Sequence, residues 1–147
     1  MANSIEYERN FAVFDADLPD DTVFSETGDI SIPGGHALVQ ILASRLNAAG
    51  WQTTNPVQHE YYGWAFFVRQ KQRKYWLLLQ TGSSWLLICE PMGLFQKRAG
   101  LSSFLSALDR VLKATPIITK LSWHTRQDYE QGEVDRGPFS PVWLPTT

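Results

Sequence analysis

Apolar residues follow a helical period in the segment 36–49. An apolar stripe runs from Leu38 to Leu46 at spacings of three and four residues, which places it on one face of a helix. Gly50 follows this segment, and glycine adopts at low cost the left-handed conformation that ends many helices. We therefore predict a helix over 36–49 that ends at Gly50.

The middle of the chain changes to the patterns of strands. The segments 64–69, 75–80 and 85–90 are strongly apolar and are joined by short polar turns, which predicts an antiparallel meander. The second and third segments are apolar on both faces, as is typical of central strands that are covered on both sides. Pro91-Met92-Gly93 is expected to end the third of these strands. Shorter strands or extended pieces are predicted at 7–14, 30–32 and 51–54.

Helix and strand patterns recur near the end of the chain. The segment 104–112 has helical spacing, and Ser102 or Ser103 is expected to cap its N-terminus. The segment 117–123 alternates and predicts a last strand. Residues 125–147 lack periodicity and contain several prolines, so we expect an extended C-terminal tail.

Together these elements predict an α+β fold with a single antiparallel sheet of about five to six strands and two helices. The 147 residues form one domain, in which 1–29 is an acidic N-terminal arm or loop. Because the central strands are apolar on both faces, each face of the sheet needs cover. We favour both helices lying on one face, so that the other face buries the tail or a partner.

The chain shows no targeting or membrane-spanning segment. Its longest apolar runs are strand-sized, short of the roughly 18–20 residues that a membrane helix needs. The first ten residues lack the apolar stretch of a secretory signal. The single cysteine, Cys89, excludes an internal disulfide and a cysteine-rich zinc site, and it favours a reducing compartment. We therefore expect a cytoplasmic protein with no role at a membrane.

Charge is distributed unevenly along the chain. Residues 1–30 hold eight acidic residues against Arg9 alone, whereas residues 31–147 hold twelve Lys and Arg against seven acids. Four of the acids form a loop that is not a calcium loop, because its sixth position is Asp20 instead of the required glycine, although Glu26 stands at the twelfth. We interpret this acidic loop as a docking surface that steers a basic partner, with a merely solvated loop as the alternative. Its members are Asp15, Asp17, Asp20 and Asp21.

Aromatic residues make up 13% of the chain, and the most unusual local string is Tyr61-Tyr62-Gly63-Trp64. Tyrosine and tryptophan anchor interfaces because they bury a large area while losing little rotamer entropy. We predict that Tyr61, Tyr62 and Trp64 bind a partner, with core packing or stacking on a small molecule as alternatives. If the strand begins early enough to include all three, alternation places Tyr62 and Trp64 on one face and Tyr61 on the other.

No motif of catalysis or cofactor binding stands out. The histidines His36, His59 and His124 are too far apart in sequence for a local metal motif, and we expect them in exposed loops. His59-Glu60 offers a base beside an acid, but adjacent strand residues point to opposite faces. Pro33-Gly34-Gly35 lacks the residues of a phosphate-binding loop and is interpreted as a turn that caps the following helix. We predict no cofactor and no metal.

Nucleic-acid binding is disfavoured. The turn at 71–74 is basic and lies next to aromatic strands, which are the ingredients of a single-strand binder. The net charge of −2 and the acidic N-terminal segment oppose a polyanion, however.

A helix followed by Gly50-Trp51, a proline-containing link, Tyr62-Gly63-Trp64 and an apolar strand at 75–80 occur in this order within 34–80, about a third of the chain. This segment resembles small immunity proteins of bacterial contact-dependent and type VI secreted toxin systems. The resemblance implies stoichiometric binding to a cognate toxin, commonly by covering its active site. No individual binding residue carries over, because these interfaces differ from pair to pair.

We therefore predict a non-enzymatic protein that neutralises a toxin, with the acidic loop as its steering surface and the aromatic string as its anchor. One alternative is a secretion or assembly chaperone, which we expect to be a homodimer that binds an unfolded client. Another is a small hydrolase-like enzyme that uses His59 and Glu60. The sequence leaves the oligomeric state open.

Overall fold

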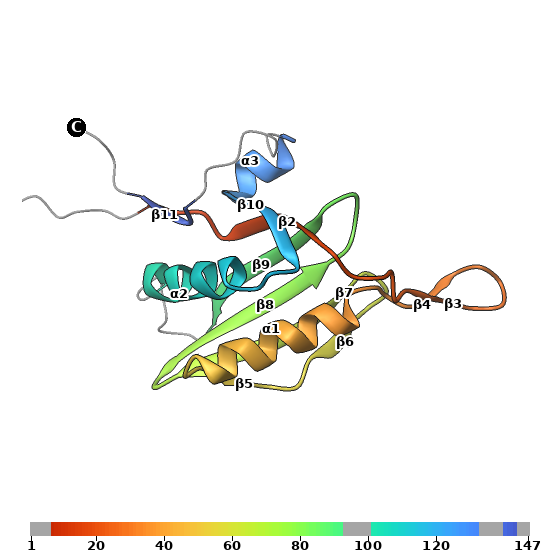
Figure 1. The fold of residues 1–147 in the computed structure, drawn as a ribbon, viewed down its shortest axis with the longest axis horizontal. Coiled ribbons are helices and arrows are strands. Elements are labelled where there is room, and N and C mark those ends of the chain that lie inside the picture. Colours follow the sequence, from red (N-terminus) through yellow and green to blue (C-terminus); the bar gives the residue numbers. More distant parts are fainter. Residues whose placement is uncertain (1–6, 93–100, 133–139, 144–147) are drawn as a thin grey trace, which may run out of the picture.

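An antiparallel sheet of seven strands forms the centre of the fold (Figure 1). In the computed structural model, which describes residues 7–92, 101–132 and 140–143, the strand order is β10-β2-β9-β8-β7-β5, and β6 also pairs with β7. The predicted α+β class with one main antiparallel sheet is confirmed. The strand β6 was not predicted, and it forms a hairpin with β7. The strands are β2 (Phe11–Ala16), β5 (Gln52–Thr53), β6 (Val57–His59), β7 (Gly63–Gln70), β8 (Arg73–Gln80), β9 (Trp85–Met92) and β10 (Ile118–His124).

Two smaller strand pairs lie outside this sheet. Strand β1 (Tyr7–Glu8) pairs with β11 (Val142–Trp143), so segments from both ends of the chain lie side by side. Strand β3 (Val23–Phe24) pairs with β4 (Ile30–Ile32). Figure 1 shows this second pair as a hairpin that projects from the body of the molecule. We call residues 23–32 the hairpin arm.

Helix α1 (His36–Ala48) matches the predicted helix, and Gly50 has a φ of +100° as the predicted left-handed residue beyond it. Helix α2 (Leu101–Lys113) contains Ser102 and Ser103 as helical residues, so the prediction that one of them caps it is wrong.

A short helix, α3 (Arg126–Glu130), forms in the segment that was predicted to be extended. The Thr125 side chain caps it by accepting a hydrogen bond from the Asp128 N–H at 3.1 Å.

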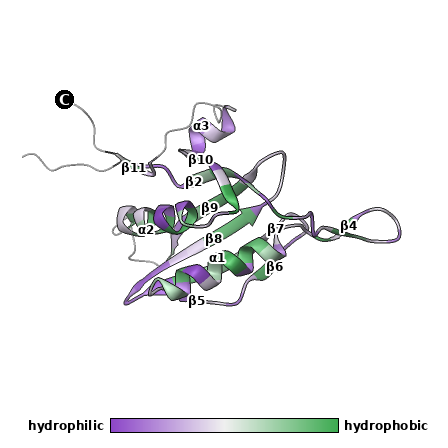
Figure 2. Cartoon of the chain, in the orientation of Figure 1, coloured by the Kyte–Doolittle hydropathy of each residue, from purple (hydrophilic) through white to green (hydrophobic). Residues whose placement is uncertain are grey.

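The main core lies between one face of the sheet and both long helices, as predicted (Figure 2). Leu42 of α1 and Phe104 of α2 are fully buried there in one cluster with Phe66 and Leu77 of the sheet. Trp123 is also fully buried, and its indole N–H donates to the Asp109 carboxylate at 2.9 Å. The largest side chain of the core therefore keeps its polar atom paired.

The opposite face of the sheet is covered only in part. Phe11, Val13 and Leu86 form a small buried cluster there, and Tyr129 of α3 packs against it. The ring centroids of Phe11 and Tyr129 are 5.5 Å apart. Further along this face, Phe67 and Trp76 are half-buried. Part of the C-terminal segment thus covers one end of the face.

Pro91 lies within β9, opposite Tyr75 of β8, so the prediction that it ends the strand is wrong. The pairing of β9 with β2 extends no further than the bond from the Cys89 N–H to the Asn10 carbonyl. At Pro91, β9 therefore has β8 as its one neighbouring strand. On its other side no second strand needs the backbone N–H donor that proline lacks. The next predicted residue, Gly93, is outside the described residues.

Candidate partner-binding surface

Large apolar side chains that remain exposed gather at one end of the molecule. In the part of the chain that the structure describes, eight such side chains are exposed, and all but Met92 lie on the hairpin arm, on β6 or in the turn that joins β6 to β7. Clustered apolar exposure of this kind marks interaction sites on soluble domains. We call this region the arm surface, and its exposed apolar side chains are Val23, Phe24, Ile30, Ile32, Val57, Tyr61 and Tyr62.

One side chain links the two halves of the arm surface. The Gln58 side-chain amide donates to the Ser31 carbonyl at 3.3 Å and to the Glu60 carbonyl at 2.8 Å. The hairpin arm is thereby held next to the β6–β7 turn. Between them lies a cavity of about 600 Å³, lined by Ser25, Asp29, Ile30, Ser31 and Tyr61.

The tip of the hairpin arm is closed by its own polar residues. The Ser25 N–H donates to the Asp29 carbonyl at 2.7 Å, and Gly28 takes a φ of +88°, which suits a residue without Cβ. The Thr27 hydroxyl contacts the Ser25 hydroxyl at 2.9 Å and the Asp29 carboxylate at 3.1 Å. The sequence of the tip thus fixes a tight turn.

The arm surface is acidic as well as apolar. Four exposed acids lie on it or within three residues of it in the sequence, and no Lys or Arg occurs in residues 10–44 or 46–68. Exposed basic residues, by contrast, lie where β7 turns into β8, with Lys71 in the turn and Arg73 at the start of β8. The arm surface therefore presents negative charge around exposed apolar groups. Its acids are Asp20, Glu26, Asp29 and Glu60.

The four carboxylates of the predicted acidic loop have different surroundings. Asp15 is half-buried at the end of β2, with Lys120 at 3.7 Å, whereas Asp17 is exposed. The exposed Asp20 accepts hydrogen bonds from the Thr22 hydroxyl at 2.6 Å and the Thr22 N–H at 3.0 Å. These bonds, the hydroxyl bond foremost, lower the pKa of Asp20.

Asp21, the fourth member of the loop, caps helix α1. Its carboxylate accepts hydrogen bonds from the Gly35 N–H at 2.7 Å and the Ala37 N–H at 2.9 Å. Gly35 is the N-cap residue, has a φ of +106° and offers no side chain for capping. The interpretation of Pro33-Gly34-Gly35 as a turn and cap is confirmed, and the anion at the helix N-terminus is the chain's own carboxylate.

The aromatic string is divided between the surface and the core. Tyr61 and Tyr62 are exposed, by 68% and 44%, whereas Trp64 is 7% exposed and belongs to the main core. The Trp64 indole N–H donates to the Pro33 carbonyl at 2.9 Å, and its ring stacks on His36 at 4.2 Å. Core packing, which the sequence left open, is the environment of Trp64.

The condition on which Tyr62 and Trp64 were expected to share a face, an early start of the strand, is not met. Strand β7 begins at Gly63, so Tyr62 lies in the preceding turn, where strand alternation does not apply. Tyr62 packs against His59, which in turn contacts Trp76 on the face of the sheet away from the long helices.

The histidines lie on different elements and in different environments. His36 is exposed at the start of α1, whereas His59 is half-buried at the end of β6. His124 at the end of β10 is 1% exposed, and its Nε2 lies 2.7 Å from the Ser122 hydroxyl, so the expectation of an exposed loop is wrong for it. Residues 7–92, 101–132 and 140–143 contain no group of three or more His, Cys, Asp or Glu side chains that could hold a metal ion.

The predicted pair His59 and Glu60 is not arranged as a base with its orienting acid. The His59 ring meets the edges of two aromatic rings, 5.3 Å from Tyr62 and 5.5 Å from Trp76. Glu60 is exposed in the turn, with a left-handed φ of +53°. Cys89 is fully buried, and burial raises the pKa of its thiol well above the ordinary value.

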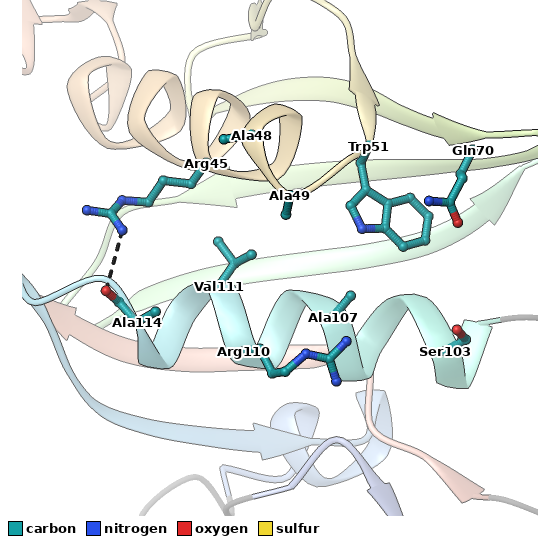
Figure 3. A pocket seen from close by; sticks show the side chains of 10 residues that line it. All are labelled: Arg45, Ala48, Ala49, Trp51, Gln70, Ser103, Ala107, Arg110, Val111 and Ala114. Atoms are coloured by element: carbon teal, nitrogen blue, oxygen red, sulfur yellow. Dashed lines mark hydrogen bonds between the residues drawn. The ribbon is translucent and has the colours of Figure 1, made fainter.

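A second hollow, which sequence reasoning missed, lies between α1 and α2 (Figure 3). This groove has a volume of about 620 Å³, and two arginines but no acidic residues line it. Arg45 reaches across to the Ala114 carbonyl at 3.4 Å. Only the pairing of the helices brings these residues together. They are Arg45, Ala48, Ala49, Trp51, Gln70, Ser103, Ala107, Arg110, Val111 and Ala114.

No family model, no curated protein and no solved structure matches this chain. Among the described helices, none has both the length and the apolar character needed to cross a membrane.

Proposed function

We propose that this chain is a non-enzymatic binding protein that docks a basic partner protein on the arm surface. The observation that carries the proposal is the coincidence of exposed apolar side chains and uncompensated carboxylates on the same two segments. Phe24, Tyr61 and Tyr62 supply area to bury, and the acids around them favour a partner of opposite charge.

The proposed mechanism has two steps. The carboxylates accelerate encounter with a basic surface, because complementary charge steers diffusion at low salt. The exposed aromatic and aliphatic side chains then lose water and hold the complex, as interface anchors do. A stable complex of this kind buries about 1,600 Å² in total, or half of that on each partner. The hairpin arm suits this role because it projects from the body (Figure 1).

We propose further that the partner is a cognate toxin and that the chain is its immunity protein in the cytoplasm. The support is the resemblance of the segment 34–80 to immunity proteins, together with the position of Tyr61 and Tyr62 inside that segment. Neutralisation then takes place by stoichiometric binding that covers the active site of the toxin.

The test is affinity capture with matched variants. Tagged wild-type chain, a Tyr61→Ala/Tyr62→Ala double variant and a Met92→Ala control are each used to capture proteins from a lysate of the source cells. Met92 is an exposed apolar side chain outside the arm surface. We expect one protein at close to equal amounts with the wild type and the control, and much less with the double variant.

The captured protein is then expressed alone and together with this chain. If the captured protein is toxic when expressed alone and harmless when co-expressed with this chain, the chain is its inhibitor. Equal capture by the double variant would contradict the arm surface as the binding site. A captured protein that is harmless when expressed alone would contradict the claim that the partner is a toxin.

A chaperone is the second candidate, because Phe67 and Trp76 leave an apolar area half-buried on the partly covered face of the sheet. A homodimer formed through that face would bind an unfolded client. Sedimentation equilibrium separates the two functions: a monomer agrees with the inhibitor, whereas a dimer that Trp76→Glu dissociates would favour the chaperone.

A further inference from the structure

We infer that the cavity between the hairpin arm and the β6–β7 turn receives an arginine side chain of the partner. This inference rests on the proposed function and specifies the chemistry that its binding surface recognises. The cavity has a volume of about 600 Å³ and combines the Asp29 carboxylate with the exposed aromatic ring of Tyr61.

The lining of the cavity matches the parts of an arginine side chain. A guanidinium group is a planar cation that stacks on an aromatic face and pairs with a carboxylate. Tyr61 provides the ring, Asp29 provides the carboxylate and Ile30 provides an apolar wall for the methylene stem. Lysine carries its charge on a compact ammonium group, which has no planar face for the ring, so arginine is the better match.

The Asp29 carboxylate retains capacity for a cation. Its Oδ2 atom accepts a hydrogen bond from the Thr27 hydroxyl at 3.1 Å, and among the described residues no ion pair joins Asp29 to a base. An ionised carboxylate has about four acceptor sites, so most remain for a bidentate guanidinium. The nearest bases along the chain, Arg9 and Arg45, lie outside the hairpin arm and the β6–β7 turn.

The cavity is also held in shape before a partner arrives. The bond from the Ser25 N–H to the Asp29 carbonyl closes the arm, and the Gln58 amide joins Ser31 to the β6–β7 turn. Pre-organisation of this kind reduces the entropy lost when a side chain enters.

The inference is tested by NMR titration of the ¹⁵N-labelled full chain with N-acetyl-arginine methylamide. Its neutral isostere N-acetyl-citrulline methylamide and the lysine analogue are titrated in parallel. We expect saturable shifts centred on Ser31 and Tyr61, with affinity at least about tenfold lower for citrulline, the scale of one charge-assisted hydrogen bond.

Two variants with the same change of charge are then compared. Asp29→Asn removes the carboxylate of the cavity, and Glu130→Gln removes an exposed carboxylate on α3. We expect the arginine shifts to disappear in the first variant and to persist in the second. Equal shifts with citrulline, or arginine shifts that persist in Asp29→Asn, would overturn the inference.

Capture of the partner distinguishes this inference from the proposed function. Loss of capture with Asp29→Asn but not with Glu130→Gln supports an arginine in the cavity. Capture that depends on Tyr61 and Tyr62 but not on Asp29 leaves the proposed function in place and overturns the inference. If neither wild type nor variants capture a protein, the proposed function fails, whatever the arginine probe shows.

Discussion

The carboxylate of Asp21 accepts a hydrogen bond at 2.7 Å from the N–H of Gly35, which lies 14 residues further along the chain. With the bond from the Ala37 N–H, it satisfies two donors at the start of α1 that no local side chain reaches. The acidic loop is therefore not one uniform surface. Asp21 stabilises the start of α1, whereas Asp17 and Asp20 are exposed to solvent and can contact a partner.

Asp21→Ala is expected to lower the free energy of unfolding by about 1–2 kcal/mol, the effect of losing an N-cap and a charge at a helix N-terminus. Urea denaturation followed by circular dichroism measures it. Asp17→Ala is the matched control and is expected to change the stability by less than about 0.5 kcal/mol, because Asp17 is exposed. Equal stabilities of the two variants would contradict the capping role.

A substitution of Trp64 is expected to lower the free energy of unfolding by more than a substitution of either neighbouring tyrosine. Trp64→Phe removes the indole N–H, leaves the Pro33 carbonyl without this donor in a buried site, and costs roughly 1–3 kcal/mol. Tyr61→Ala and Tyr62→Ala are expected to stay within about 1 kcal/mol of the wild type, since the two side chains remain 68% and 44% exposed. Thermal denaturation of the three variants checks the order, and a tyrosine variant less stable than Trp64→Phe would contradict it.

The carboxyl of Asp20 is expected to titrate below the ordinary aspartate pKa, because the Thr22 hydroxyl and N–H stabilise its charged form. A lowered pKa contributes stability above the pKa of the unfolded chain, and this contribution is lost as the pH falls through the folded value. The window is therefore acidic, below about pH 4. NMR titration measures the pKa, and Thr22→Val, which removes the hydroxyl, is expected to raise it. If the pKa of Asp20 is the same in Thr22→Val as in the wild type, the Thr22 hydroxyl is not the cause of the lowered pKa.

The Cys89 thiol is expected to resist alkylation in the folded protein and to react rapidly in urea. It is fully buried, and burial, foremost, raises its pKa, so the reactive thiolate forms only when the structure opens. A raised pKa contributes stability below the unfolded value, roughly pH 8.5, and this contribution is lost as the pH rises towards the folded value. Iodoacetamide labelling followed by mass spectrometry measures the rate. Labelling as fast as that of a small free thiol would contradict the burial.

Local patterns predicted the parts of this fold that depend on local physics. Helix α1 and the left-handed Gly50 follow from apolar spacing and from the conformational freedom of glycine. Pro91 was misjudged because the cost of a proline in a strand depends on whether a second strand lies beside it. That neighbour is set by the order of the strands, which no local pattern contains.

The candidate site was harder to predict than the fold, because it is formed by contacts between segments that are distant in the sequence. Tyr61 and Tyr62 are exposed, and their role in binding a partner stays a prediction. Trp64 and Asp21, by contrast, are hydrogen-bonded to Pro33 and to Gly35. The hairpin arm was predicted only in part, as an extended piece at 30–32, because the isolated string Val23-Phe24 gives no strand period. The Gln58 side chain, which is distant from the hairpin arm in sequence, joins the arm to the aromatic turn.

Charge reversal at the surface-facing members of the acidic loop tests electrostatic steering. Asp17→Lys/Asp20→Lys is expected to slow association with the captured partner several-fold at low salt, and the difference is expected to shrink as salt shortens the Debye length to about 10 Å near 0.1 M. Asp21 is left unchanged in this variant, because its loss would weaken α1 and mix stability with binding. Glu130→Lys on α3 controls for net charge. Stopped-flow association at several salt concentrations gives the rates, and an unchanged rate that does not depend on salt would remove Asp17 and Asp20 from the mechanism while leaving the apolar anchors in place.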